Sequence, residues 1–261
     1  MKEKKNRERK MHPAADEVLS VMKGHRSIRK YKKNTVNDRL IDRICEAAQQ
    51  AAFASQTYSV IVSKKGPLPF GAPVLLTFCV DIHKFELIMK KRGWKWVTND
   101  VFSLLLGLED ACYFAQNFAL AAEAHGLGTC FLGYAPYAAS AIRKKYGIPK
   151  RVFPFVQMTL GFPDEDPPVR PRYPREFVLF REQYKIKDES IAKAMKKMDE
   201  GYLRQDYYKK LNAKIPLIKG KKENFTYKGY SWTEHICRKW GQWNPEDGRI
   251  KKQFREAGFD I

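Results

Sequence analysis

The amino-acid sequence predicts an α+β or three-layer α/β protein. Short apolar segments of the kind that form buried strands recur along the chain. Longer segments, with apolar residues three and four positions apart, lie between them and are typical of helices. Helices that alternate with a few buried strands pack as layers around one core. With 261 residues, the chain is long enough for one large domain or two small ones.

Two helices are expected near the start of the chain. Residues 16–33 begin with apolar side chains at helical spacing, and this helix should stop near Gly24. The segment NDRLIDRICEAAQQAA continues the helical pattern, and Asn37 or Asp38 can cap it.

Apolar runs predict the strands. Residues 57–62, TYSVIV, are short and β-rich, and residues 74–82, VLLTFCVDI, are nearly all apolar, as expected of a strand buried on both faces. Residues 153–163, FPFVQMTLGFP, form another such run that ends in a glycine turn. We also expect a β-type run at EFVLF, residues 176–180.

Residues 103–125 predict a long helix with little surface facing water. Gly126 then supplies the residue after the helix, which can adopt a positive φ at low cost. Apolar residues along one side of the helix step by alternating fours and threes: Leu104, Leu108, Ala111, Ala115, Phe118 and Ala122.

The segment LAAEAHGLGTCFLGYAPY, residues 120–137, places a short apolar run between glycines. Two interpretations are open. The segment is either a helix cap followed by a buried strand, or a backbone surface that receives a planar cofactor.

The last third of the chain changes character. Residues 188–211 predict a charged amphipathic helix, which is followed by a basic loop and by a terminal helical arm that begins at SWTEHICRKWGQW. We therefore divide the chain into a basic N-terminal tail (1–15), a core (16–182) and a helical C-terminal extension (183–261).

Charge alone does not identify a partner. The net charge of +20 and the pI near 9.7 are compatible with nucleic-acid binding. However, the lysines are scattered, acids are interspersed, and neither zinc-finger spacing nor an RNP-type motif occurs. We do not expect a nucleic-acid partner. A basic surface that attracts phosphorylated cofactors or keeps the protein soluble explains the charge more simply.

The five cysteines are widely spread and form no CxxC pair, so neither a disulfide framework nor a zinc site is expected. We expect each to act as a small buried hydrophobe in a reducing cytoplasm. No secretory signal is recognised, and no apolar run of roughly 20 residues can span a bilayer. The spacing of histidines and acids indicates neither a metal site nor a catalytic side chain.

Two basic motifs have side chains that suit phosphate. Guanidinium groups match phosphate oxygens, and a proline between two arginines lowers the entropy lost on binding. A solvated charged surface is the alternative for each motif. The motifs are GHRSIRKYK, with His25, Arg26, Ser27 and Arg29, and VRPRYP, with Arg170 and Arg172.

Two further polar residues have open interpretations. Gln56, just before the first strand, can hydrogen-bond the edge of a ligand or cap the strand. Asp110 lies within the long buried helix and can bond a neighbouring backbone group or an arginine.

Taken in order, the segments HRSIR, AAFASQTYS, APVLLTFCVDIHK, AAEAHGLGTCFLGY and VRPRYP resemble the nitroreductase family of flavoproteins. They are most similar to its NADPH-dependent flavin/nitroaromatic (oxygen-insensitive) reductase branch. The resemblance covers roughly residues 17–261, and GLGTCFLG and HRSIR are its most specific parts. It implies a three-layer α/β/α sandwich with a mainly antiparallel central sheet, a long buried central helix and an extended helical C-terminal arm.

The resemblance also implies a homodimer with two FMN molecules at the subunit interface. Gln56 would contact the flavin, and the backbone of Gly133 and Tyr134 would lie beside the isoalloxazine ring. Hydride would pass through flavin N5 from NADPH or NADH to a small-molecule acceptor, so we name no catalytic side chain. The implied phosphate and ribityl ligands are His25, Arg26, Ser27 and Arg29, joined at the phosphate by Arg170 and Arg172.

The basic loop KIPLIKGKKENFTYKG lies where the resembling branch places basic residues over the cofactor entrance. Several cations on one loop can bind the 2′-phosphate that distinguishes NADPH from NADH. A solvated basic loop is the alternative. The residues concerned are Lys219, Lys221 and Lys222.

The sequence departs from the family in the segments AAFAS and SKKGPLPFG, which are shortened, and at Tyr134, where close relatives have glycine. These changes alter the pocket in which an acceptor would bind. We expect an FMN-dependent NAD(P)H oxidoreductase that acts on nitroaromatics, quinones or free flavin. The alternatives are a specialised flavoenzyme of the same fold, such as a reductive dehalogenase, and a basic binding protein for an anionic partner.

Overall fold

The computed structural model describes residues 12–218, 220–242 and 247–261. The chain forms two compact units. The first contains the described residues up to Pro167 together with Ile250–Ile261, and the second is Pro168–Arg249. Most of the predicted N-terminal tail, residues 1–11, lies outside the described residues. The functional boundary expected at residue 182 stays a prediction.

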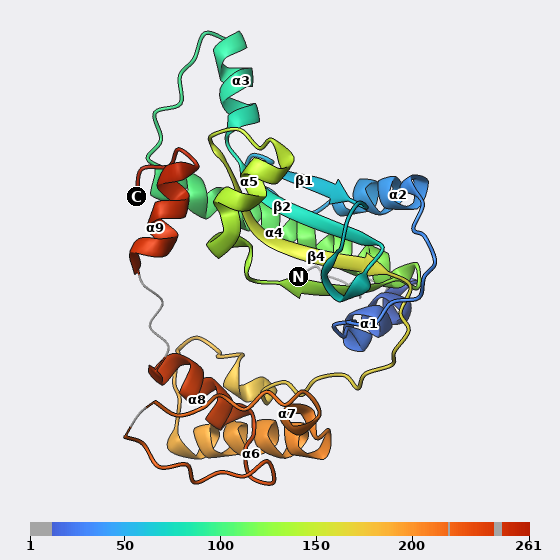
Figure 1. The fold of residues 1–261 in the computed structure, drawn as a ribbon, viewed down its shortest axis with the longest axis vertical. Coiled ribbons are helices and arrows are strands. Elements are labelled where there is room, and N and C mark those ends of the chain that lie inside the picture. Colours follow the sequence, from blue (N-terminus) through green and yellow to red (C-terminus); the bar gives the residue numbers. More distant parts are fainter. Residues whose placement is uncertain (1–11, 219, 243–246) are drawn as a thin grey trace, which may run out of the picture. The chain divides into compact units, whose positions relative to one another are not determined.

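The first unit is built on a four-stranded sheet of order β1-β2-β4-β3, in which every neighbouring pair is antiparallel (Figure 1). Its strands confirm the apolar segments predicted from the sequence. Because the directions alternate, the start of β1, the end of β2 and the start of β4 share one end of the sheet, while the shorter β3 ends level with the middle of β4, where Leu132 pairs with Gln157. The strands are β1 (Tyr58–Ser63), β2 (Val74–Asp81), β3 (Gly128–Leu132) and β4 (Val152–Gly161).

The long predicted helix, α4 (Asp100–Ala124), covers one face of the sheet and lies behind the strands in Figure 1. Phe78 of β2 contacts the rings of Phe114 and Phe118, with centroids 6.0 and 6.1 Å away. The expectation that little of this helix faces water is wrong for its first turns. Leu105 is 52% exposed, and Val101 and Phe102 are also exposed, within the part of the chain that the structure describes.

Both predicted N-terminal helices are present. In α2 (Asp38–Ala48), the Asn37 side chain accepts a hydrogen bond from the backbone N–H of Leu40, as a helix cap does. Ile41 and Ile44 of this helix are buried in the core that includes α4. By contrast, α1 (Ala15–Gly24) contains no buried residue.

A third layer covers the opposite face of the sheet. Helix α5 (Ala139–Tyr146) contributes Ile142 to a buried cluster with Cys79 and Val152. Helix α9 (Asp247–Glu256) packs instead on the side of α4: its Phe254 lies on Phe153, with ring centroids 4.1 Å apart, in a cluster that includes Leu104 of α4. The observed layers and antiparallel sheet confirm the predicted fold class. The remaining short elements of this unit are η1 (Pro69–Gly71), α3 (His83–Lys91) and η2 (Ala135–Ala138).

The second unit is helical. Its buried core contains Met198, Tyr202, Tyr208 and Tyr230. The first two residues lie on α6, the third lies on α7, and Tyr230 lies in the loop before α8. The helix predicted over 188–211 is two helices, because the chain turns at Asp206, which has a φ of 51°. The elements are η3 (Arg175–Phe177), α6 (Asp188–Arg204), α7 (Tyr207–Lys210) and α8 (Trp232–Gln242).

The prediction of a β-type run at EFVLF is wrong. The chain forms the single turn η3, in which the N–H of Phe177 donates to the carbonyl of Pro174 at 3.0 Å. Phe177 packs on Tyr173, with ring centroids 5.0 Å apart, while Val178 and Leu179 are exposed. The apolar residues find a ring contact within this unit instead of a neighbouring strand.

Two glycines explain how the chain leaves α4 and enters β3. Gly126 has a φ of 74° and turns the chain at the end of the helix. At Gly128, an added Cβ would lie 2.6 Å from Cγ1 of Ile28. The absence of a side chain therefore lets the segment around Ile28 lie directly against β3, where the N–H of Ile28 donates to the carbonyl of Thr129 at 2.8 Å.

Candidate cofactor-binding site

The HRSIR motif runs alongside the first part of β3, and Ser27 forms an isolated parallel bridge with Thr129. Side chains alternate along this extended segment. Ile28 is buried against Gly128, whereas Ser27 and Arg29 act on the Cys130 thiol. Burial raises the pKa of Cys130, and the Arg29 cation and the Ser27 hydrogen bond oppose that shift.

Arg29 is the cation of this motif whose charge remains available. Its side chain is half-buried, and within the described part of the chain its guanidinium forms no ion pair. A half-buried guanidinium without a carboxylate partner suits an anionic ligand, because it can donate two parallel hydrogen bonds to phosphate oxygens.

His25 is anchored to the end of α4. Its Nδ1 lies 2.7 Å from Oε1 of Glu123, and the Thr129 hydroxyl donates to the same oxygen at 3.3 Å. Glu123 therefore ties the start of the motif to β3. The sequence offered no signal for this contact, because Glu123 is 98 residues from His25.

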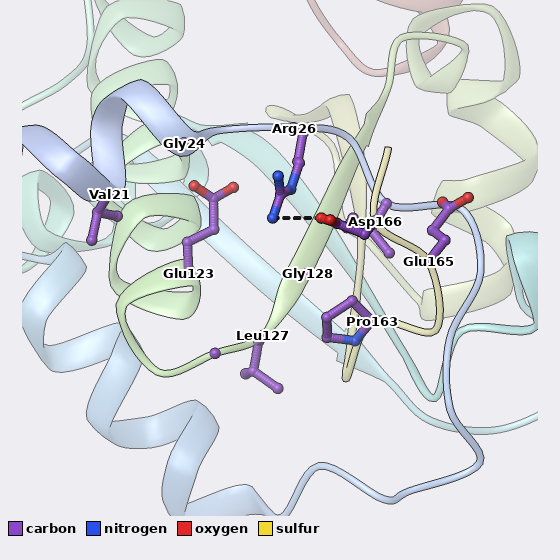
Figure 2. A pocket seen from close by; sticks show the side chains of 11 residues that line it. Val21, Gly24, Arg26, Glu123, Leu127, Gly128, Pro163, Glu165 and Asp166 are labelled. Atoms are coloured by element: carbon purple, nitrogen blue, oxygen red, sulfur yellow. Dashed lines mark ion pairs between the residues drawn. The ribbon is translucent and has the colours of Figure 1, made fainter. Parts of the chain in front are cut away.

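An acidic segment after β4 holds the other side of the motif. Nη2 of Arg26 lies 2.8 Å from Oδ1 of Asp166 (Figure 2). Oε1 of Glu165 accepts hydrogen bonds from the backbone N–H groups of Arg29 and Lys30. The run of acids directly after a predicted strand was the signal that sequence reasoning missed.

These groups surround a cavity of about 460 Å³ between α1, the end of α4 and the 163–166 segment (Figure 2). Acids and Arg26 line it together, and Arg26 is already paired there. Its main polar lining residues are Arg26, Glu123, Glu165 and Asp166.

Gln56 lies at the opposite end of the sheet, just before β1. It has a φ of 54° and is exposed. The buried carboxylate of Asp110 binds the residues on either side of it. The open question about Asp110 is thereby answered: it bonds backbone groups.

Gly133 and Tyr134 follow the last residue of β3, which pairs with Gln157 in the middle of β4, and β3 is the edge strand opposite β1 and Gln56. A Cβ added at Gly133 would meet no atom within 4 Å, so this backbone faces open space. The Tyr134 ring is 63% exposed and stacks on Tyr137, with centroids 5.8 Å apart.

Arg170 and Arg172 belong to the second unit. Nη1 of Arg170 donates to Oε1 of Gln205 at 2.6 Å, and its guanidinium lies 4.1 Å from the centre of the Tyr207 ring. Arg172 is exposed and donates to the carbonyls of Arg170 and Pro171, each at 3.2 Å. Their expected role at the phosphate stays a prediction.

The basic loop is described in part. Lys219 lies outside the described residues, and Lys221 and Lys222 are exposed. Their expected role toward NADPH also stays a prediction.

All five cysteines are free thiols, and Cys79 and Cys130 are buried as expected. Cys112 and Cys237 are exposed, so the expectation of burial is wrong for them. Within the described ranges, no group of three or more His, Cys, Asp or Glu side chains is arranged to hold a metal. None of the helices in that part of the chain is both long and apolar enough to cross a bilayer.

Comparisons with known proteins agree with this fold. The model of the Nitroreductase family matches residues 61–162. A Cr(VI) reductase of Pseudomonas sp. (strain G-1) is 31% identical over 201 residues, which cover 71% of this chain and 83% of the relative. An FMN reductase [NAD(P)H] of Bacillus subtilis (strain 168) is 31% identical over 191 residues, which cover 67% of this chain and 77% of the relative.

Among solved structures, the hypothetical oxidoreductase YcnD from Bacillus subtilis superimposes with a TM-score of 0.79 at 26% sequence identity. The superposition covers 94% of this chain and 98% of that one. Together with the HRSIR segment, which lies alongside the GLGTCFLG segment that forms β3, these similarities show that the chain belongs to the nitroreductase family.

Proposed function

We propose that this protein is an FMN-dependent NAD(P)H oxidoreductase that passes hydride to nitroaromatic, quinone or flavin acceptors. Membership of the family supports this class, as do relatives named Cr(VI) reductase and FMN reductase [NAD(P)H]. One structural observation carries the site. The Ser27 hydroxyl and the Arg29 guanidinium lie near the start of β3, and the open backbone at Gly133 follows its end.

The residues present fit FMN in donor chemistry and in spacing. Thr129, beside Ser27, and Gly133 are four residues apart, or roughly 13 Å along a strand. That is the order of the separation between the phosphate and the ring system of FMN. Ser27 and Arg29 supply donors for the phosphate end, and no side chain obstructs the backbone at Gly133. Gln56 presents an exposed side chain just before β1, the edge strand opposite β3.

The roles of these side chains follow from their chemistry. When bound, FMN supplies the N5 atom that accepts hydride from NAD(P)H and donates it to an acceptor. Arg29 binds and neutralises phosphate charge, and Gln56 orients the polar edge of the ring. Glu123, Glu165 and Asp166 hold the HRSIR segment in register with β3. We assign no acid or base to the protein.

We further propose a homodimer in the cytoplasm. The exposed apolar side chains at the start of α4, including Phe102 and Leu105, form a surface that a second copy can bury. Five free thiols fit a reducing compartment. We retain residues 16–182 as the FMN-binding core and 183–261 as the helical extension.

The first experiment is an FMN titration of the purified apoprotein, followed by NADPH oxidation with a quinone or a nitroaromatic. We expect a yellow protein with near-stoichiometric FMN and acceptor-dependent NADPH oxidation. Arg29→Ala should weaken FMN binding, while Arg39→Ala, an exposed arginine on α2, should leave it unchanged. A colourless protein that refuses FMN and binds DNA at physiological salt would contradict the proposal. Halide release faster than nitro reduction would indicate the dehalogenase alternative.

A further inference from the structure

The chain between β2 and α4 projects beyond the end of the sheet (Figure 1). This part, the α3 protrusion, consists of α3 and residues 92–99, which return from the tip of the helix to the start of α4. Helix α3 contains no buried residue. Two hydrogen bonds close the turn at its end: the N–H of Gly93 donates to the carbonyl of Lys90 at 3.1 Å, and the N–H of Trp94 donates to that of Met89 at 2.9 Å.

Two tryptophans in the returning segment have different surroundings. Trp96 faces inward, because its ring centroid lies 5.7 Å from that of Phe85 and its Nε1 donates to Oγ of Ser103 at 3.0 Å. These contacts tie the segment to both α3 and α4. By contrast, Trp94 is 70% exposed and Val97 is 91% exposed. One tryptophan therefore anchors the segment, while the other lies on its outer surface.

The outer surface of the α3 protrusion combines apolar side chains with cations. Residues 87–98 contain no acid. The carboxylate just before them, Glu86, is paired with Arg151, whose Nε lies 2.9 Å away. Within the described part of the chain, none of the cations of the protrusion that are listed below forms an ion pair. The exposed residues are the apolar Leu87, Ile88, Trp94 and Val97 and the cationic Lys90, Lys91, Arg92 and Lys95.

This combination fits a lipid surface that carries negative charge. An indole ring is well accommodated at the level of the headgroups, since its apolar body and its N–H meet an apolar and a wet environment there. Lysine and arginine beside it are attracted to anionic headgroups. A second copy of this chain fits less well, because it carries the same net charge of +20. The first turns of α4, which contain no cation, remain the surface assigned to the dimer.

We propose that the α3 protrusion is a docking surface for anionic phospholipid, which its cations bind while Trp94 enters the interface between headgroups and acyl chains. The protein lies on the bilayer and does not span it. A few cations and one indole ring give reversible, salt-sensitive binding. For a protein of the cytoplasm, the anionic inner leaflet is the surface concerned. The inference does not depend on FMN binding.

The test is co-sedimentation of the full chain with vesicles of equimolar phosphatidylserine and phosphatidylcholine, and with vesicles of phosphatidylcholine alone. We expect binding to the first kind only, and weaker binding as salt rises. Replacing Lys90 and Lys91 together by glutamine should weaken binding about five-fold for each lysine removed. The matched control replaces Lys209 and Lys210, which are also exposed and also lie in the last turn of a helix, and it should leave binding unchanged.

A second pair of variants tests the indole ring. Trp94→Ala should weaken vesicle binding about ten-fold, because apolar surface is no longer removed from water. Trp240→Ala, at a position of the second unit that is 67% exposed, should not weaken it. Brominated phosphatidylcholine in the anionic vesicles should quench the tryptophan fluorescence of the wild type more than that of Trp94→Ala. Should Trp94→Ala not fold, Val97→Ser replaces it with the same expected loss of binding.

Each contrary result has a distinct meaning. If the wild type binds both kinds of vesicle equally, or neither, the inference is wrong. If the Lys209 and Lys210 variant loses as much binding as the Lys90 and Lys91 variant, the overall charge of the chain binds the lipid, and the inference is also wrong. If Trp94→Ala dissociates the wild-type oligomer in sedimentation without lipid, the α3 protrusion is instead a contact between copies. Failure of the wild type to bind FMN contradicts the proposed function alone.

Discussion

Replacing Gly128 by alanine puts a methyl group into space that Ile28 already occupies. The new Cβ would lie 2.6 Å from Cγ1 and 2.8 Å from Cβ of Ile28. The second of these atoms is next to the backbone, so a change of rotamer cannot remove the contact. Ile28 is 3% exposed, and its N–H is bound to Thr129. The HRSIR segment must therefore move away from β3.

Overpacking of this kind costs about 1–3 kcal/mol of unfolding free energy. For a protein of this size, each kcal/mol lowers Tm by about 2–4 °C. Gly128→Ala should therefore lower Tm by several degrees. It should also weaken FMN binding, because Ser27 and Arg29 move together with Ile28.

The assay is thermal unfolding of the apoprotein by circular dichroism, with an FMN titration of the same samples. Gly133→Ala is the matched control. Its Cβ would meet nothing within 4 Å, so Tm should stay unchanged while FMN binding weakens. Combining Gly128→Ala with Ile28→Ala should cost less than the sum of the two single changes, because the second removes part of the clash. If the Gly128→Ala protein has the same Tm as the wild type, the close approach of Ile28 to β3 is refuted.

Three other predictions follow from the proposed site. Arg26→Ala and Arg172→Ala should each weaken FMN binding by about 1.5–3 kcal/mol, as measured by fluorescence titration; unchanged affinity in both variants would remove them from the phosphate site. Sedimentation should show an obligate dimer that buries well above roughly 2,000 Å², and Leu105→Glu should dissociate it; a folded, FMN-bound wild-type monomer at micromolar concentration would contradict this. NADPH should have a higher kcat/KM than NADH at low salt, with a ratio that falls as salt rises, because lysines act as screened point charges. Replacing Lys219, Lys221 and Lys222 together by serine should lower kcat/KM for NADPH and leave kcat/KM for NADH nearly unchanged. An equal loss with both donors, or no loss with either, would show that this loop does not select NADPH.

Local patterns predicted much of the fold. The apolar runs at β2 and β4 became strands because a strand buried on both faces needs only a continuous apolar segment, and the short β-rich segment at β1 pairs with β2 as an edge strand. The Asn37 cap and the turn at Gly126 were also predictable, since each depends on neighbouring backbone groups. The order of the motifs along the chain also indicates the nitroreductase family.

The sequence by itself determined the strands, the long helix, the caps and the set of candidate ligands, because each of these depends on residues that are close along the chain. Only the tertiary structure decided what those residues meet. It paired His25 with Glu123, wrapped the loop at Gln56 around Asp110, and left EFVLF without a neighbouring strand. The partners in these contacts are as many as 98 residues apart. No local sequence pattern predicts such a contact, because its two partners meet only when α4, β3 and β4 pack together.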